Sequence, residues 1–231
     1  MKEINSCVCE IRYKPNSKVL DYRGTWAEMI SKHLQLPDWK IIENRLDVYD
    51  NKSMEQAFVG FRQMGMACNN APTKNYFPEK VNKLISFVMK LDGFGASIHV
   101  ERIGIRIRFC SDIDKKFSDL KDLYLSKYVN INADAKKTIN AELVDTGINL
   151  NFKDSIGSFN TISGPMEKAQ IQQFFENRKP EEIPEVGLYY DVDYFINPDK
   201  VLSSQDVIND VKKLGEGCWQ RFEEIKGIIG K

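Results

Sequence analysis

The sequence predicts an α+β fold, with one antiparallel sheet built from two pseudo-repeated halves and helices packed on one side. A long alternating strand, Ser97–Phe109, lies near the middle of the chain. The order strand, helix, strands, helix occurs twice, about a hundred residues apart. The two halves also begin alike, since Cys9–Tyr13 resembles Ile105–Phe109. We therefore expect two halves, residues 1–93 and 94–231, that share the sheet within one compact domain.

The central strand predicts its own orientation, because the side chains of a strand alternate between two faces. One face carries only apolar residues, namely Ile103, Ile105, Ile107 and Phe109. The earlier apolar pair, Ile98 and Val100, has the opposite parity. A bulge or a tight reversal near Arg102 is the simplest way to keep one face on the core.

The rest of the first half follows from alternating and helical spacings. Trp26, Ile30 and His33 recur at the spacing of a helix, and Pro78 suits the first turn of another. The predicted elements are the strand Ser6–Lys14, the helix Tyr22–Gln35, the strands Lys40–Tyr49 and Gln56–Met66, and a helix from Pro78 that stops at Gly93.

The second half continues from the central strand with a helix, further strands and a long last helix. Asn130–Asn140 is the most polar connection in the chain, so we expect a surface excursion there. The predicted elements are the helix Phe117–Tyr128, the strands Glu142–Phe152, Ser158–Met166, Lys168–Phe175 and Val186–Ile196, and the helix Ser204–Ile229.

The last helix carries an apolar stripe close to heptad spacing, which has two interpretations. Packing on its own sheet is the first, and the seam of a homodimer through residues 204–229 is the alternative. Gly215 and Gly217 in its middle indicate a kink or a close approach of another backbone.

Composition bounds the class of protein. The 231 residues are 42% hydrophobic and 11% aromatic, enough to bury a core. Lys plus Arg equals Asp plus Glu at 33 each, so nothing in the net charge draws the chain to nucleic acid or to an anionic membrane. The start lacks the apolar region of a secretory signal, and no apolar run is long enough to span a membrane. We expect a soluble cytoplasmic protein.

The five cysteines fit no disulfide framework, and we expect them to be small buried hydrophobic residues. With two histidines in the chain, a zinc site has few ligands available. No P-loop, dinucleotide fingerprint, G-x-S-x-G or H-E-x-x-H pattern is present. We therefore assign no catalytic residue, no metal ligand and no cofactor.

Charged residues on two strands form the candidate binding site. Asp191 and Asp193 share one face of their strand, as Arg106 and Arg108 share one face of the central strand beside the gap at Gly104. Equal and opposite pairs predict neighbouring strands with the four side chains paired. If the arginines are instead unpaired, they would with Arg102 form an anion-binding face. Tyr189 and other nearby tyrosines are candidates to line a ligand cleft.

Several of these segments resemble a sporadically distributed family of uncharacterised bacterial proteins of about 230–270 residues. The resemblance lies in Cys9–Tyr13, Arg102–Arg106, Asp191–Phe195 and the last helix with Phe222 and Ile225. The family tends to carry a histidine where this chain has Gly217 or Cys218. The family has no established activity, so the resemblance implies a bacterial, cytoplasmic protein and transfers no catalytic residue.

The sequence favours a non-enzymatic binding or interaction protein that recognises a small anionic ligand or a protein partner. Its candidate ligand-binding residues are Arg102, Arg106, Arg108, Asp191, Asp193 and Tyr189. The alternative is a metal-dependent phosphoryl- or nucleotidyl-transfer enzyme, because two carboxylates on one strand can hold Mg²⁺.

Overall fold

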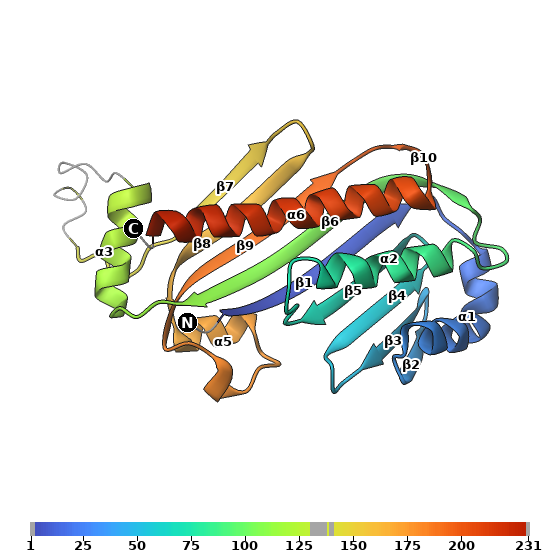
Figure 1. Cartoon of the computed structure of the whole chain (residues 1–231), viewed down its shortest axis with the longest axis horizontal. Coiled ribbons are helices and arrows are strands. Elements are labelled where there is room, and N and C mark those ends of the chain that lie inside the picture. The colour runs from blue at the N-terminus through green and yellow to red at the C-terminus, as the bar shows by residue number, and fades with distance from the viewer. Residues whose placement is uncertain (1–2, 130–137, 139–140, 230–231) are drawn as a thin grey trace.

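The computed structural model describes residues 3–129, 138 and 141–229 and has one large antiparallel sheet (Figure 1). The strands follow the order β2-β3-β4-β5-β1-β6-β9-β8-β7, and β10 pairs with β6. They are β1 (Glu3–Tyr13), β2 (Asp38–Ile42), β3 (Arg45–Asp50), β4 (Glu55–Gly60), β5 (Gln63–Asn69), β6 (Ser97–Asp112), β7 (Ile148–Lys153), β8 (Ser158–Glu167), β9 (Val186–Ile196) and β10 (Lys200–Ser203). The predicted α+β class with an antiparallel sheet is confirmed.

The described residues also form five α-helices. They are α1 (Lys18–Leu34), α2 (Tyr76–Val88), α3 (Phe117–Tyr128), α5 (Lys168–Phe174) and α6 (Ser204–Ile229). In Figure 1 α2 and α6 run across the face of the sheet nearest the viewer, and we call this the helical face. The prediction that all helices pack on one side is wrong for α5. Its Ile171 packs with Ile4, Cys110 and Tyr189, whose side chains point to the opposite, open face.

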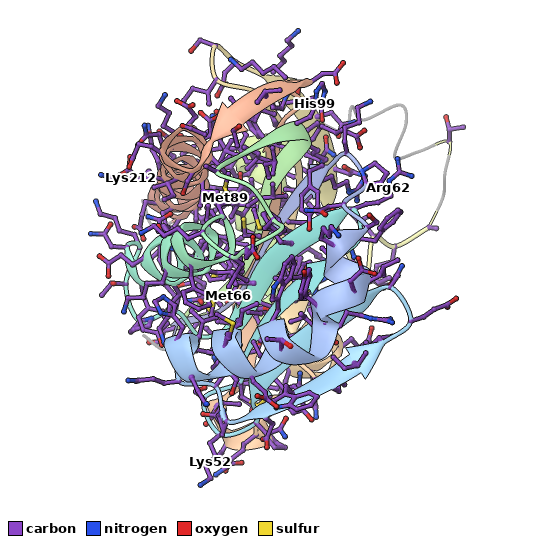
Figure 2. All side chains as sticks on the ribbon, turned by 90° about the vertical axis from the view of Figure 1, so that its right-hand side faces the viewer. Lys52, Arg62, Met66, Met89, His99 and Lys212 are labelled. Atoms are coloured by element: carbon purple, nitrogen blue, oxygen red, sulfur yellow. The ribbon has the colours of Figure 1, made fainter. Side chains whose placement is uncertain are left out.

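The main core lies between the helical face of the sheet and the helices that cover it. Alternate residues of β1 and β6, such as Cys9, Ile11 and Ile105, are fully buried there with the apolar stripe of α6. Figure 2 shows this packed layer, with Met66 and Met89 inside it and charged side chains around the outside. Because the apolar faces of β1 and β6 point the same way, the polar faces of both strands point to the open side.

The predicted bulge in the central strand is confirmed. Between β1 and β6 the register runs evenly until Arg12 pairs with Arg102, and then Tyr13 pairs with Val100. Glu101 is therefore the extra residue, and it restores the parity that the apolar pattern required.

The outer part of the sheet differs from the prediction. Lys40–Tyr49 and Gln56–Met66, expected as single strands, are two hairpins that turn at residues 43–44 and 61–62. Neither turn contains the Gly or Pro that usually indicates one. The apolar residues of each segment fit one long strand as well as two short strands, so their pattern does not show where the chain reverses.

Two predictions in the second half are also wrong. Lys168–Phe175 is the helix α5 rather than a strand, and the side chains of Glu167 and Gln170 form a capping box at its start. In the stretch Glu142–Phe152 only Ile148 onward is strand. The predicted excursion Asn130–Asn140 lies, apart from Thr138, outside the described residues.

The last helix, α6, runs over β6 and β9 with its apolar stripe inward. Val207, Leu214 and Phe222 are fully buried, which confirms packing on its own sheet. A close approach does occur at the glycines, but side chains make it and not another backbone as predicted. A Cβ at Gly215 would lie 2.9 Å from Cγ of Pro78, and one at Gly217 would lie 2.5 Å from Cε1 of Tyr194.

The two predicted halves meet along β1 and β6 in the middle of one continuous sheet. The structure does not confirm that they are repeats. The second half inserts α5, on the open face, between two of its strands, whereas the first half has no helix between its strands β2 and β5. None of the described helices is both long enough and apolar enough to cross a membrane.

Candidate functional site

The candidate site lies on the open face, where β1, β6 and β9 run side by side. The register places Glu10 opposite Gly104 on one side of β6 and Asp193 opposite Arg106 on the other. Their polar side chains therefore gather over the middle of the sheet. We call the following residues the arginine–carboxylate cluster: Glu10, Arg12, Arg102, Arg106, Arg108, Asp191 and Asp193.

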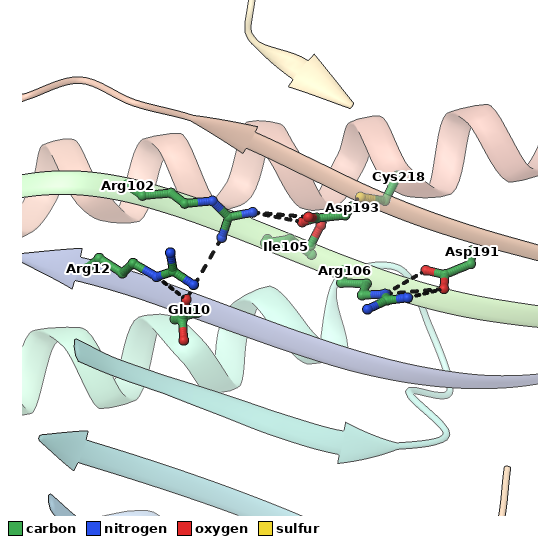
Figure 3. A network of polar contacts seen from close by, with 8 residues as sticks. All are labelled: Glu10, Arg12, Arg102, Ile105, Arg106, Asp191, Asp193 and Cys218. Atoms are coloured by element: carbon green, nitrogen blue, oxygen red, sulfur yellow. Dashed lines mark hydrogen bonds and ion pairs between the residues drawn. The ribbon is translucent and has the colours of Figure 1, made fainter. Parts of the chain in front are cut away.

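The predicted pairing is confirmed for Arg106 with Asp191, whereas Asp193 pairs with Arg102 and Arg108 hydrogen-bonds to neither aspartate. Nε and Nη2 of Arg106 donate to the Asp191 carboxylate at 2.9 Å and 2.5 Å (Figure 3). The pair is diagonal. Arg106 lies directly opposite Asp193, but its side chain reaches Asp191, the neighbouring residue of β9 on the same face. Asp191 is only 3% exposed, and its hydrogen bonds raise the pKa of Arg106.

Arg102 reaches Asp193 over a longer diagonal, because Asp193 lies opposite Arg106, beyond Gly104 on the same strand. Its Nη2 donates to both carboxylate oxygens at 3.0 Å and 3.1 Å. The guanidinium lies across Gly104, where a Cβ would come within 2.7 Å of the Arg102 Cζ, and it stacks over the Phe195 ring at 4.8 Å. The gap predicted at Gly104 is thus filled by the Arg102 side chain.

Two residues of the cluster were missed by the sequence analysis. Arg12 donates to Glu10 at 2.6 Å, and Glu10 lies 4.0 Å from Nη1 of Arg102 (Figure 3). The sequence held a signal for both, since they form the polar face of the first strand. The sequence pattern does not show, however, that β1 lies beside β6.

Arg108 and Tyr189 complete the set of predicted residues. Nε of Arg108 is 3.6 Å from Asp191, too far for a hydrogen bond, and it is buried without a hydrogen-bond partner among the described residues. The buried hydroxyl of Tyr189 donates to Asp191 at 3.2 Å, and burial raises the pKa of this phenol. All six predicted residues therefore lie together, with Tyr189 serving Asp191 rather than lining an open cleft.

A shallow hollow of about 280 Å³ lies over the cluster, bordered by Gly104, the four arginines and Asp193. Four guanidinium groups face three carboxylates, so the cluster carries one surplus positive charge. No described residue accepts a hydrogen bond from Nη1 of Arg106. An arginine has five N–H donors in a fixed fork, and a carboxylate partner holds that fork in place without using all of them. The hollow can therefore bind a small anionic group.

The cluster is less suited to a metal ion. Both aspartates already accept hydrogen bonds from guanidinium groups, which cancel the negative charge that Mg²⁺ requires. Within the described ranges, no three His, Cys, Asp or Glu side chains are arranged to hold a metal. All five cysteines are buried, and burial raises the pKa of Cys9 and Cys110 to about 12.

No protein-family model matches the chain, and the comparison with curated proteins finds no match either. The resemblance to the sporadically distributed bacterial family therefore stays a proposal.

Proposed function

We propose that this chain is a non-enzymatic binding protein whose open sheet face recognises an anionic group. The observation that carries the proposal is the surplus guanidinium at the rim of a hollow whose other arginines are held in place by carboxylates. The recognised group is a carboxylate or a phosphate, because both match the planar fork of arginine. It belongs either to a small ligand or to an acidic segment of a protein partner.

Arg108 is the residue on which this binding depends most. Its Nε makes no hydrogen bond to the described residues, and its side chain is 34% exposed at the edge of the hollow. An incoming anionic group would meet the surplus charge at the exposed part of this side chain, since Nε itself is buried. Charge-assisted hydrogen bonds of this kind are about twice as strong as neutral ones.

Calorimetric titration with inorganic phosphate at low salt tests the proposal. We expect Arg108→Gln to weaken binding at least about tenfold, as removal of a charged hydrogen bond does. Lys212→Gln removes one positive charge from the outer surface of α6 and should leave the affinity unchanged. Equal affinities for the Arg108→Gln variant and the unaltered chain, or no binding at about 10 mM phosphate, would refute it. Native mass spectrometry of the purified protein then separates a bound small anion from a co-purifying acidic protein.

The alternative, a metal-dependent phosphoryl- or nucleotidyl-transfer enzyme using Asp191 and Asp193, has less support because arginines already neutralise both carboxylates. It requires that Mg²⁺ or Mn²⁺ raise the melting temperature and that Asp193→Asn abolish the rise. Calorimetry that detects no divalent-ion binding at millimolar concentration would dispose of it.

A homodimer through Ser204–Ile229 and a cytoplasmic location in a bacterium belong to the same proposal. The dimer has weaker support than the anion site, because the apolar stripe of this helix is already buried against the sheet. The outer face of the helix is charged, with Lys212 and Glu216 exposed upon it. Sedimentation of the purified chain tests its oligomeric state.

A further inference from the structure

The helical face is incompletely covered at one end of the sheet. The helix α6 lies over β6 and β9, whereas β8 and β7 extend beyond it (Figure 1). On this face β7 carries the apolar residues Ile148, Leu150 and Phe152. Its neighbour β8 carries Phe159 together with the polar residues Thr161 and Ser163. Leu150 and Phe152 of β7 are each 45% exposed. Apolar residues that continue a core but that no described element covers are typical of a binding surface.

These residues form one wall of a cleft of about 680 Å³ between the β7–β8 hairpin and α6. That volume lies in the range of small-molecule sites, which are mostly apolar with a few polar groups. The apolar lining comes from three directions: Leu150, Phe152 and Phe159 of the hairpin, Ile225 and Ile228 of α6, and Tyr128 of α3.

One buried hydroxyl in the cleft has no hydrogen-bond partner among the residues that the structure describes. Tyr190 lines the cleft, is 5% exposed, and exchanges no hydrogen bond with any described residue. Burial raises the pKa of its hydroxyl, which therefore stays a neutral phenol. The charge of Arg221 lowers the pKa of this hydroxyl and that of Glu224 raises it, and both residues line the cleft. A buried phenol usually has a hydrogen-bond partner, so the hydroxyl is available to a ligand.

The charges around the cleft limit what can enter. The charged lining residues are Asp154, Lys213, Glu216, Arg221 and Glu224, which together carry one surplus negative charge. Arg221 is also engaged, since it pairs with Asp154 and stacks on the Phe159 ring at 4.0 Å. An anionic ligand would therefore meet net repulsion, and the remaining cation among these lining residues, Lys213, already interacts with the Asp210 carboxyl.

We propose that this cleft binds an uncharged, mainly apolar small molecule whose carbonyl or hydroxyl group bonds the Tyr190 hydroxyl. The site is separate from the arginine–carboxylate cluster, because it lies on the opposite face of the sheet. An anionic amphiphile, an apolar helix of another protein, or a second copy of this chain are the rival occupants.

Fluorescence titration with the uncharged ketone dye Prodan tests the proposal, with the anionic dye anilinonaphthalene sulfonate as the charged comparison. We expect Prodan to bind and the sulfonate to bind at least about tenfold more weakly, because the rim is negative. Tyr190→Phe should weaken Prodan binding about two- to tenfold, the loss of one hydrogen bond.

Two lysine substitutions locate the dye. Leu150→Lys places a charge inside the cleft and should weaken Prodan binding more than about tenfold. Ile162→Lys is the matched control, because Ile162 is 43% exposed on the same hairpin but on the open face. Circular dichroism and the melting temperature show that each variant is folded.

Several results would overturn the inference. Equal Prodan affinities for the two lysine variants would mean that the dye binds elsewhere, and an unchanged affinity in Tyr190→Phe would remove the role of the hydroxyl. Sulfonate binding as tight as that of Prodan would contradict the charge argument. If Prodan does not bind, and Leu150→Lys but not Ile162→Lys dissociates a dimer, the occupant is a second copy of the chain.

Discussion

Asp191 is the most constrained charge of the arginine–carboxylate cluster. It is 3% exposed, it accepts hydrogen bonds from Arg106 and Tyr189, and it has Arg108 3.6 Å away. A carboxylate so placed depends on its partners, because removing one partner of a buried ion pair leaves a charge that is poorly solvated. The aspartates of the cluster therefore hold the arginines in place, and only the arginines can contact a ligand.

We expect a double-mutant cycle between Arg106 and Asp191 to give a coupling free energy of about 1–3 kcal/mol. The reason is the bidentate geometry to a buried carboxylate, moderated by the 45% exposure of the Arg106 side chain. Denaturant unfolding of Arg106→Gln, Asp191→Asn and the double variant provides the measurement.

The matched control is Lys212 and Glu216, an exposed pair on α6 whose charged atoms lie 4.0 Å apart. Its coupling should stay below about 0.5 kcal/mol. A coupling near zero for Arg106 and Asp191 would mean that the observed hydrogen bonds add nothing to stability and that Arg106 is free to bind a ligand.

Asp154 connects the β7–β8 turn to β9 and α6, because it accepts a hydrogen bond from Tyr194 and pairs with Arg221. Partial burial would raise the pKa of this carboxyl. Hydrogen bonds from the N–H groups of Gly157 and Ile156 and from the Tyr194 hydroxyl, together with the Arg221 charge, outweigh burial and lower the pKa below its ordinary value. The folded chain therefore binds this proton less readily than the unfolded chain does.

The lowered pKa predicts a pH dependence of stability. Asp154 stabilises the fold at pH values above the ordinary carboxyl pKa of about 4, and this contribution disappears as the pH falls through the lower folded value. The difference in unfolding free energy between the unaltered chain and Asp154→Asn should therefore be constant near neutral pH and shrink below about pH 4. A difference that grows on acidification would contradict the argument.

At the scale of elements, α6 lies so close to its neighbours that two of its glycines are required by packing. Gly217 is buried against the Tyr194 ring, whereas a Cβ at Gly227, in the exposed last part of the same helix, would meet nothing within 4 Å. Substitution by alanine should therefore have opposite effects on stability at Gly217 and at Gly227.

We expect Gly217→Ala to destabilise the protein by about 1–3 kcal/mol, because the added methyl group overpacks the contact with Tyr194. Gly227→Ala should stabilise it by about 0.5–1 kcal/mol through helix propensity alone. Thermal unfolding of both variants provides the measurement. If Gly217→Ala is also stabilising, the helix can shift outward, and the close approach is not required.

At the scale of the whole molecule, the predicted boundary between residues 93 and 94 does not separate two cores. Glu3–Tyr13 of the first half pairs with residues 100–111 of the second along its whole length. The main apolar core contains Cys9 and Ile11 of the first half together with Ile105 and Phe222 of the second.

We therefore expect the intact chain to unfold in one cooperative transition. The separate fragments 1–93 and 94–231 should each fail to fold, because each would expose one side of the β1–β6 seam and half of the core. Calorimetry and circular dichroism of the three proteins check this. A cooperative transition in either fragment alone would show that the halves are independent domains.

Much of the fold could be read from local periodicity. Ser97–Phe109, Val186–Ile196 and Ser204–Ile229 were predicted correctly because a core on one side imposes a period of 2 or 3.6 residues on the chain. The neighbouring positions of β6 and β9 also followed from sequence, since the charges of Arg106 and Asp191 are complementary. The prediction was wrong for short segments such as α5, because seven residues with few apolar positions fit the period of a strand and that of a helix equally well.

Only the tertiary structure decided which polar faces meet and which apolar faces stay uncovered. That Glu10 and Arg12 join the cluster depends on β1 lying beside β6, a pairing between residues about ninety positions apart that no local pattern specifies. The cleft beside Tyr190 depends on where α6 ends its cover of the sheet. A pattern in sequence records that a residue faces apolar surroundings, whereas the arrangement of the elements determines whether those surroundings come from the chain itself or from a ligand.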